Sequence, residues 1–132
     1  MINNDEMMPL LVSSCPSFLP LWETFLSEWE EEACKLHYLA LHAFACHLVE
    51  LLSKGQVEDF VGVFAVVERL HLEGNHYVRE AATVGLLESL QNTNIHKFTQ
   101  PEQFLQYLSP ETNRWWNKLN RFWENGGIMF DD

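Results

Sequence analysis

The amino-acid sequence predicts an all-α fold, a compact bundle of six to seven helices with a central antiparallel hairpin. Apolar residues recur at steps of three and four through most of the chain, which is the period of an amphipathic helix. Proline and glycine stand where these runs end, as they do between helices. The length of 132 residues suits one domain, so residues 1–132 are expected to share a core, with 126–132 as a flexible tail.

The first half of the chain predicts three helices. The first covers about Asn4–Ser14, with Asn4 as its N-cap and two acidic residues in its first turn. An apolar stripe predicts the second over residues 17–29. The third is expected over Ala33–Ser53, and Gly55 follows as a stop because glycine can adopt the left-handed conformation.

The most apolar segment, residues 57–73, predicts a central helix with apolar residues on nearly all sides. Gly74 and Asn75 connect it to a helix over residues 76–90, and two helices joined by two residues lie antiparallel as neighbours. Within the second helix, Gly85 permits close approach of another helix. The pair is HEAT-like, because it resembles one unit of an α-solenoid, although one unit does not make an array.

The C-terminal part of the chain predicts a polar loop and two further helices. The loop covers residues 91–99, and a short helix follows over 102–107. Pro110 is expected as the first residue of a last helix that reaches about residue 124, with Ser109 as its cap. The buried face of this helix is expected to hold Trp115, Trp116, Leu119, Phe122 and Trp123.

Charge and cysteine usage narrow the classes of partner and the compartment. Nineteen acidic residues against eight basic ones give a net charge of −11, which argues against binding to nucleic acid or to anionic membranes. Three cysteines without a CxxC spacing are typical of a reducing compartment. The uncharged stretch of residues 36–49 is shorter than the roughly 20 residues that a bilayer requires. A cytoplasmic location is therefore predicted.

Three histidines and two cysteines share the predicted helix over Ala33–Ser53. Successive histidines His37, His42 and His47 are rotated by about 140° around the helix, so they do not converge on one metal ion. The pairs Cys34/His37 and His42/Cys46 can each supply two zinc ligands, but no further ligands follow at a recognisable spacing. We therefore expect no metal site and no cofactor.

Two glutamates interrupt apolar stretches of the predicted hairpin. Glu68 and Glu88 are offset by about seven residues, roughly 10 Å of helix rise, which disfavours a carboxylate dyad. Capping or pairing with arginine is the simpler interpretation. The alternative is a small metal-dependent or hydrolytic enzyme that uses Glu68, His71 and Glu88, since His71 lies three residues after Glu68 on the same face. No GxSxG, GxGxxG or HExxH motif is present, so an enzyme is not expected.

The acidic residues are unevenly distributed. Residues 1–60 hold ten acidic residues against two lysines, and Glu28, Glu30, Glu31 and Glu32 form one run. A one-sided acidic surface accelerates encounter with a basic partner and orients it.

Several segments together resemble a known family. They are Cys15-Pro16-Ser17-Phe18, Val67-Glu68-Arg69-Leu70, Glu73-Gly74-Asn75, Gly85-Leu86-Leu87-Glu88-Ser89-Leu90-Gln91-Asn92, and Leu108-Ser109-Pro110-Glu111 with Trp115 and Trp116. In this order they resemble a family of small bacterial proteins known as a domain of unknown function, DUF7674. The resemblance covers nearly the whole chain and brings no established catalytic residues.

By analogy, the resemblance implies an immunity protein, an acidic helical domain that neutralises a cognate bacterial toxin. Its partner is then a basic toxin domain, whose active site an acidic surface occludes. We expect Glu28, Glu30, Glu31 and Glu32 to steer the partner. Glu73, Asn75 and His76 are expected to contact it, because turns between rigid helices present side chains outward. A homo-oligomeric scaffold is a further alternative.

Overall fold

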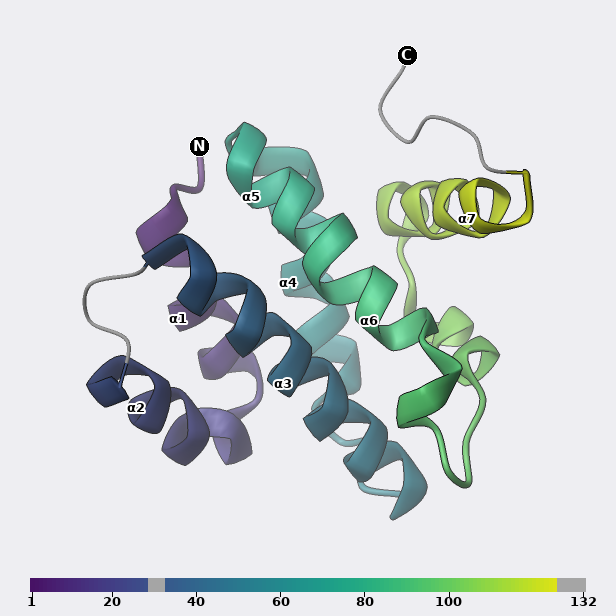
Figure 1. Ribbon diagram of the computed structural model, residues 1–132, viewed down its shortest axis with the longest axis horizontal. Coiled ribbons are helices and arrows are strands. Elements are labelled where there is room, and N and C mark those ends of the chain that lie inside the picture. Colours follow the sequence, from purple (N-terminus) through teal and green to yellow (C-terminus); the bar gives the residue numbers. More distant parts are fainter. Residues whose placement is uncertain (29–32, 126–132) are drawn as a thin grey trace.

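The computed structural model describes residues 1–28 and 33–125, with side chains for residues 1–28 and 36–122, and it is all-α (Figure 1). The α-helices are α1 (Asn4–Ser14), α2 (Leu19–Glu28), α3 (Ala33–Ser53), α4 (Phe60–Glu73), α5 (His76–Glu80), α6 (Glu88–Gln91) and α7 (Pro110–Asn125). A π-helical segment, η2 (Ala81–Leu87), joins α5 to α6, and 3₁₀ turns form η1 (Pro16–Phe18), η3 (Thr93–Ile95) and η4 (Pro101–Tyr107). The predicted flexible tail, 126–132, lies outside the described residues.

Several predicted helix boundaries are confirmed, and the N-cap residue of α1 differs from the predicted one. The first and third predicted helices are found over the same residues as α1 and α3, and Gly55 has a φ of 71° in the left-handed region. The cap of α1 is Asn3 instead of Asn4, because Asn3 and Glu6 form a reciprocal capping box. Asn4 instead accepts a hydrogen bond from Asn75 at 2.9 Å.

Helix α4 occupies the centre of the bundle and packs against α1, α5, η2, η4 and α7. It begins at Phe60, three residues later than predicted, because the Phe60 amide closes a turn onto the carbonyl of Val57. The helix is central, as predicted, but its apolar residues are not all buried. Val61 and Leu72 are 72% and 63% exposed, while Phe60, Phe64 and four further residues of α4 are buried.

The predicted hairpin is present, and its second helix runs from α5 through η2 to α6 without a break. In Figure 1 it lies beside α3, and the two cross the molecule as neighbouring diagonals. A Cβ built on Gly85 would come 2.8 Å from Cδ1 of Leu41, so the glycine permits this close approach, as predicted. Gly74, at the hairpin connection, forms an isolated parallel bridge with Ile2.

Helix α3 is long and apolar, and it is also a core element. Its residues Leu36–Ser53 have a mean hydropathy of 1.2, which satisfies the length and composition of a membrane-spanning helix. A helix in the core of a protein that folds in water meets the same criteria. Here Ala40, Leu41, Phe44 and Leu48 are fully buried inside the bundle. The core also contains an aromatic cluster of Phe60, Phe64 and Phe104, whose ring centroids lie 5.8–6.3 Å apart.

Candidate functional site

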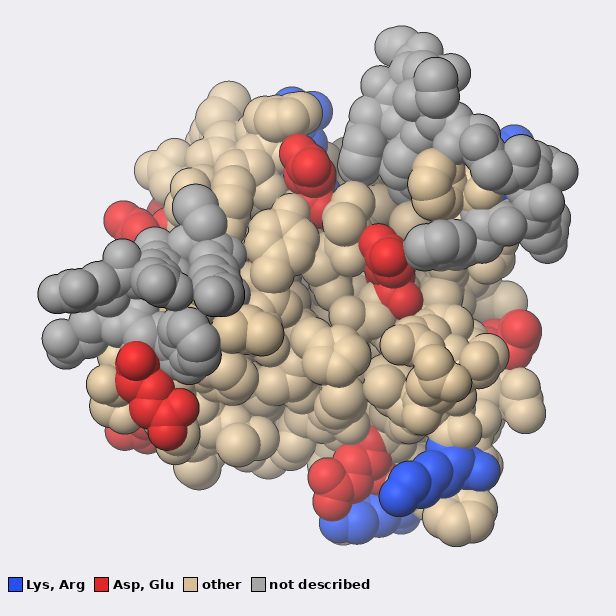
Figure 2. All heavy atoms as spheres, viewed as in Figure 1, with Lys and Arg blue, Asp and Glu red and all other residues tan. Residues whose placement is uncertain are grey.

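Only part of the predicted acidic steering run lies within the described residues. Glu28 is exposed at the end of α2, and Figure 2 shows acidic side chains near this helix as well as at several other places on the visible face. Glu30, Glu31 and Glu32 lie outside the described residues. The run therefore begins at an exposed end of α2, which in Figure 1 is well separated from the α4–α5 turn.

The predicted contact residues at the α4–α5 turn have different roles in the structure. The Asn75 side chain accepts from the Val78 amide at 2.8 Å and so caps α5, and it also donates to Asn4. Glu73 is exposed and pairs with Arg69 at 3.2 Å. His76 is exposed, with Nε2 3.4 Å from a carboxylate oxygen of Glu80. Of the three, Glu73 and His76 face solvent, while the Asn75 amide is committed to the turn.

Glu68 caps the last helix from a distance of more than 40 residues in sequence. Its Oε1 accepts from the amide and the hydroxyl of Thr112, both at 2.8 Å, and its Oε2 accepts from the amide of Glu111 at 3.1 Å. These amides belong to the first turn of α7, where backbone N–H groups have no partner within the helix. Ser109 precedes α7 as predicted, and its carbonyl accepts a hydrogen bond from the Asn113 amide. The amides of Glu111 and Thr112, the other described donors of this first turn, bind Glu68.

His71 extends this cluster into the core. The ring is 5% exposed, and its Nδ1 donates to the Val67 carbonyl at 3.0 Å, with the Thr112 hydroxyl 3.2 Å away. On the other side, Nε2 lies 3.0 Å from the hydroxyl of Thr83 in η2. Burial lowers the pKa of His71 to about 4, so the ring is neutral near pH 7. The cluster thus joins α4, η2 and α7 through satisfied hydrogen bonds.

The alternative constellation of Glu68, His71 and Glu88 does not form one site in the described structure. Glu68 and His71 share contacts through Thr112, whereas Glu88 lines a hollow with residues of α3, η2, α6, η3 and α7. Among the residues that the structure describes, no group of three or more histidine, cysteine or acidic side chains has the arrangement of a metal site.

The three histidines of α3 contact three different elements, as their rotation around the helix predicts. His37 lies 3.0 Å from the Tyr77 hydroxyl in α5, and His47 lies 2.7 Å from the Ser17 hydroxyl in η1. His42 lies 3.1 Å from the Ser89 hydroxyl in α6. Each histidine therefore contributes one polar contact between α3 and a neighbouring element.

His42 is also the centre of a short hydrogen-bonded chain. The Ser89 hydroxyl donates to the Gly85 carbonyl at 2.7 Å, so its oxygen is left to accept from Nδ1 of His42. This leaves Nε2 as the acceptor for the thiol of Cys46 at 3.7 Å. Burial raises the pKa of the Cys46 thiol, which disfavours the reactive thiolate. The arrangement therefore orients the His42 ring and does not activate the cysteine.

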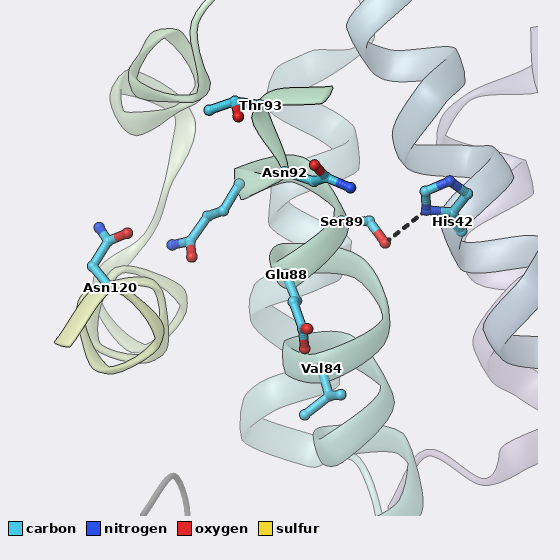
Figure 3. A pocket seen from close by; sticks show the side chains of 8 residues that line it. His42, Val84, Glu88, Ser89, Asn92, Thr93 and Asn120 are labelled. Atoms are coloured by element: carbon cyan, nitrogen blue, oxygen red, sulfur yellow. Dashed lines mark hydrogen bonds between the residues drawn. The ribbon is translucent and has the colours of Figure 1, made fainter. Parts of the chain in front are cut away.

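A hollow of about 610 Å³ opens beside this chain (Figure 3). Its lining residues are His42, Val84, Glu88, Ser89, Gln91, Asn92, Thr93 and Asn120. In Figure 3 Asn120 reaches in from α7, across from the wall that carries Glu88, Asn92 and Thr93. Burial raises the pKa of the Glu88 carboxyl, and no described residue forms an ion pair with it. An open, largely polar hollow of the described structure is thus lined by Glu88.

The chain matches the family model of the domain of unknown function DUF7674 over residues 8–124. It belongs to this family. Neither the curated proteins nor the solved structures contain a match to the chain.

The sequence singled out Glu88 and His42 of this DUF7674 protein for separate reasons, but it did not place Thr93 or Asn120 beside them. Gln91, Thr93 and Asn120 are ordinary polar residues in helices and loops, and no spacing connects Asn120 of α7 with Glu88 of α6. The Asn92 side chain accepts from the Asn94 amide at 3.0 Å and begins η3. The hollow follows from how α7 packs across the hairpin, which is a tertiary property.

Proposed function

We propose that this DUF7674 protein is a protein-binding module, an immunity protein that neutralises a basic toxin by occluding its active site. The module itself performs no chemistry in this proposal. The unpaired acidic charge of its N-terminal half is the observation that carries the proposal. The family match adds no activity, because the family has no assigned function.

The N-terminal half presents acidic side chains with little compensating positive charge. The described residues of this half include seven exposed acidic side chains: Asp5, Glu6, Glu23, Glu28, Glu50, Glu58 and Asp59. Lys54 lies in the same half and is engaged by Glu50 at 2.8 Å. The other six form no ion pair with a described residue, so their field extends into solvent.

Such a field affects association more than it affects the lifetime of the complex. Exposed charges at the rim of an interface raise the association rate and make it depend on salt, whereas buried anchors set the dissociation rate. The Glu28–Glu32 run is the proposed steering element. The α4–α5 turn, with Glu73 and His76 facing solvent, is the proposed contact element.

Affinity capture from a lysate of the source organism, eluted with rising salt and followed by mass spectrometry, is the first test. The expected result is a basic protein, captured in stoichiometric amount, that poisons cells when expressed alone and is harmless when this chain is co-expressed. Absence of any such partner, under conditions in which a candidate toxin is expressed, would contradict the proposal.

A charge-reversal pair then tests the location of the steering surface. Glu23→Lys combined with Glu28→Lys is expected to slow association with the partner about tenfold or more at low salt and to weaken its salt dependence. Glu88→Lys combined with Glu102→Lys makes the same change in net charge in the C-terminal half, outside the α4–α5 turn, and serves as the control. Equal effects of both double variants would refute steering by the N-terminal half.

A further inference from the structure

A polar groove, separate from the proposed steering surface, runs between the end of the hairpin and α7. It consists of two adjoining hollows of about 610 and 260 Å³, which share Gln91, Thr93 and Asn120 in their linings. The larger is bounded mainly by η2, α6 and η3, and the smaller by η4 and α7. These volumes are near those of small-molecule sites, about 300–1,000 Å³.

Each hollow contains one carboxylate. Glu88 lines the larger and Glu102 the smaller, and neither forms an ion pair or hydrogen bond with a described residue. No lysine or arginine is among the described residues that line the groove. The half-buried Glu88 is partly desolvated, which raises its pKa and makes a counter-charge in the groove favourable.

Gln91 lies at the junction of the two hollows and ties them to α7. Its Nε2 donates to the Trp116 carbonyl of α7 at 3.0 Å, which sets the orientation of the amide. Its Oε1 is buried and has no hydrogen-bond partner among the described residues. The oxygen is therefore shielded from the groove, and the groups that the groove offers to a ligand are the two carboxylates.

Apolar side chains also line both hollows, beside the carboxylates of Glu88 and Glu102. Val84 lies in the larger hollow, and Pro101, Leu105 and Trp116 lie in the smaller one. An aliphatic chain can pack against such a wall while its polar ends remain hydrogen-bonded. An anion would face two carboxylates, and a purely apolar ligand would leave both without a partner.

We infer that the groove binds a linear organic dication, a molecule with two amino or guanidino groups joined by an aliphatic chain. One cationic group pairs with Glu88 and the other with Glu102, and the aliphatic chain packs against the apolar side chains of the groove. This site is independent of the proposed partner surface, since its lining includes neither the steering residues nor the residues of the α4–α5 turn.

Isothermal titration calorimetry with agmatine and putrescine tests the inference, with n-butylamine as the monocationic control. A dication is expected to bind about tenfold tighter than butylamine, because it adds a second ion pair in a partly desolvated site. In ¹H–¹⁵N spectra the side-chain amide signals of Gln91 and Asn120 are expected to shift on titration.

Matched variants locate the two charges. Glu88→Gln and Glu102→Gln are each expected to reduce the affinity for the dication to that for butylamine. Glu80→Gln removes the same charge from the same continuous helix but outside the groove, and it is expected to leave the affinity unchanged. Circular dichroism of each variant establishes that it is folded.

Three results would overturn the inference. These are equal affinity for dications and butylamine, unchanged amide signals at Gln91 and Asn120, and equal losses in Glu80→Gln and Glu88→Gln. Tighter binding of the peptide acetyl-Lys-Gly-Lys-amide than of agmatine would also overturn it, because the groove would then be a peptide site. Capture of a toxin partner does not depend on any of these outcomes, so the two proposals fail separately.

Discussion

Two regions of the protein pair a glutamate with a nearby histidine, and the chain uses them in opposite ways. In the Glu68–His71 cluster, the carboxylate accepts three hydrogen bonds and the ring is buried between α4, η2 and α7. In the groove, the Glu88 carboxylate has no described partner, and His42 is exposed at its edge. The comparison shows how the two roles differ. A polar group whose hydrogen bonds are all satisfied within the protein has a structural role, whereas one without a partner in a hollow is available to a ligand.

The largest expected effect comes from Glu68→Ala, which removes the acceptor of three donors at the start of α7. We expect a loss of about 2–4 kcal/mol in the free energy of unfolding, because two amides and a hydroxyl are left without their charged partner. Urea denaturation followed by circular dichroism measures it. Glu68→Gln retains one carbonyl oxygen and serves as the control, with a smaller expected loss. A loss below about 0.5 kcal/mol for Glu68→Ala would contradict the structural role.

The second prediction uses the pH dependence of the same cluster. The pKa of His71 falls from 6.5 in the unfolded chain to about 4 in the folded protein, so between these values the unfolded state binds more protons. The stability that the neutral ring contributes to the folded state is therefore fully present above pH 6.5. It is lost as the pH falls from 6.5 through 4, by about 3 kcal/mol in total.

The matched variant isolates this contribution from those of His37 and His47, whose pKa values are also lowered by burial. His71→Gln is less stable than the wild type at pH 7, because the substituted side chain does not reproduce all contacts of the ring. This difference is expected to narrow as the pH falls from 6.5 to 4. Urea titrations at several pH values measure it, and a difference that stays constant with pH would show that His71 is not the titrating group.

The third prediction concerns the contact that brings α3 and the hairpin together beside the groove. Gly85→Ala places a Cβ 2.8 Å from Cδ1 of Leu41, and we expect a loss of about 1–3 kcal/mol as Leu41 moves. Gly62→Ala is the control, since nothing lies within 4 Å of its Cβ. There alanine is expected to stabilise the helix by about 0.5–1 kcal/mol. Thermal denaturation compares the two, and equal signs would contradict the packing described.

The smallest effect is expected from Glu88→Gln, which distinguishes the groove from the cluster. The pKa of Glu88 is raised by burial, so its ionised form opposes folding, and stability is lost as the pH rises through the raised pKa. Removing the charge is expected to leave stability unchanged or to raise it by up to about 0.5 kcal/mol at pH 7. Urea denaturation at pH 7 is the measurement. A large loss would mean that Glu88, like Glu68, is a structural residue.

Local patterns predicted most of the fold because they act over one or two helical turns. The bounds of α1 and α3, the left-handed Gly55 and the close approach at Gly85 all follow from residues adjacent in sequence. Capping was one of the two simpler interpretations of Glu68, and the structure confirms it. Which helix it caps was not predicted, because Glu68 and Thr112 are separated by 44 positions and only packing joins them. The π-helical segment was also missed, since the hydrogen-bond register of a helix leaves no clear trace in its apolar spacing.

The candidate site was less predictable than the fold for the same physical reason. The sequence identified Glu88 as a polar residue in an apolar stretch, and this residue is central to the groove. Its neighbours come from four other elements, and their polar side chains resemble those of any solvated surface. The steering role of the four glutamates was predicted from their charge alone. Three of them, Glu30, Glu31 and Glu32, lie outside the described residues.

The π-helical segment has a consequence for how the length of this chain can change. A π turn accommodates one residue more than an α turn, so deleting one residue within Ala81–Leu87 can restore a regular α-helix without breaking it. Because the deletion also removes the wide turn, the residues downstream keep nearly the same orientation around the helix axis. Glu88 and Ser89 would still face His42 and the groove. The wide turn is therefore the place where a single-codon deletion would spare both the helix and the groove.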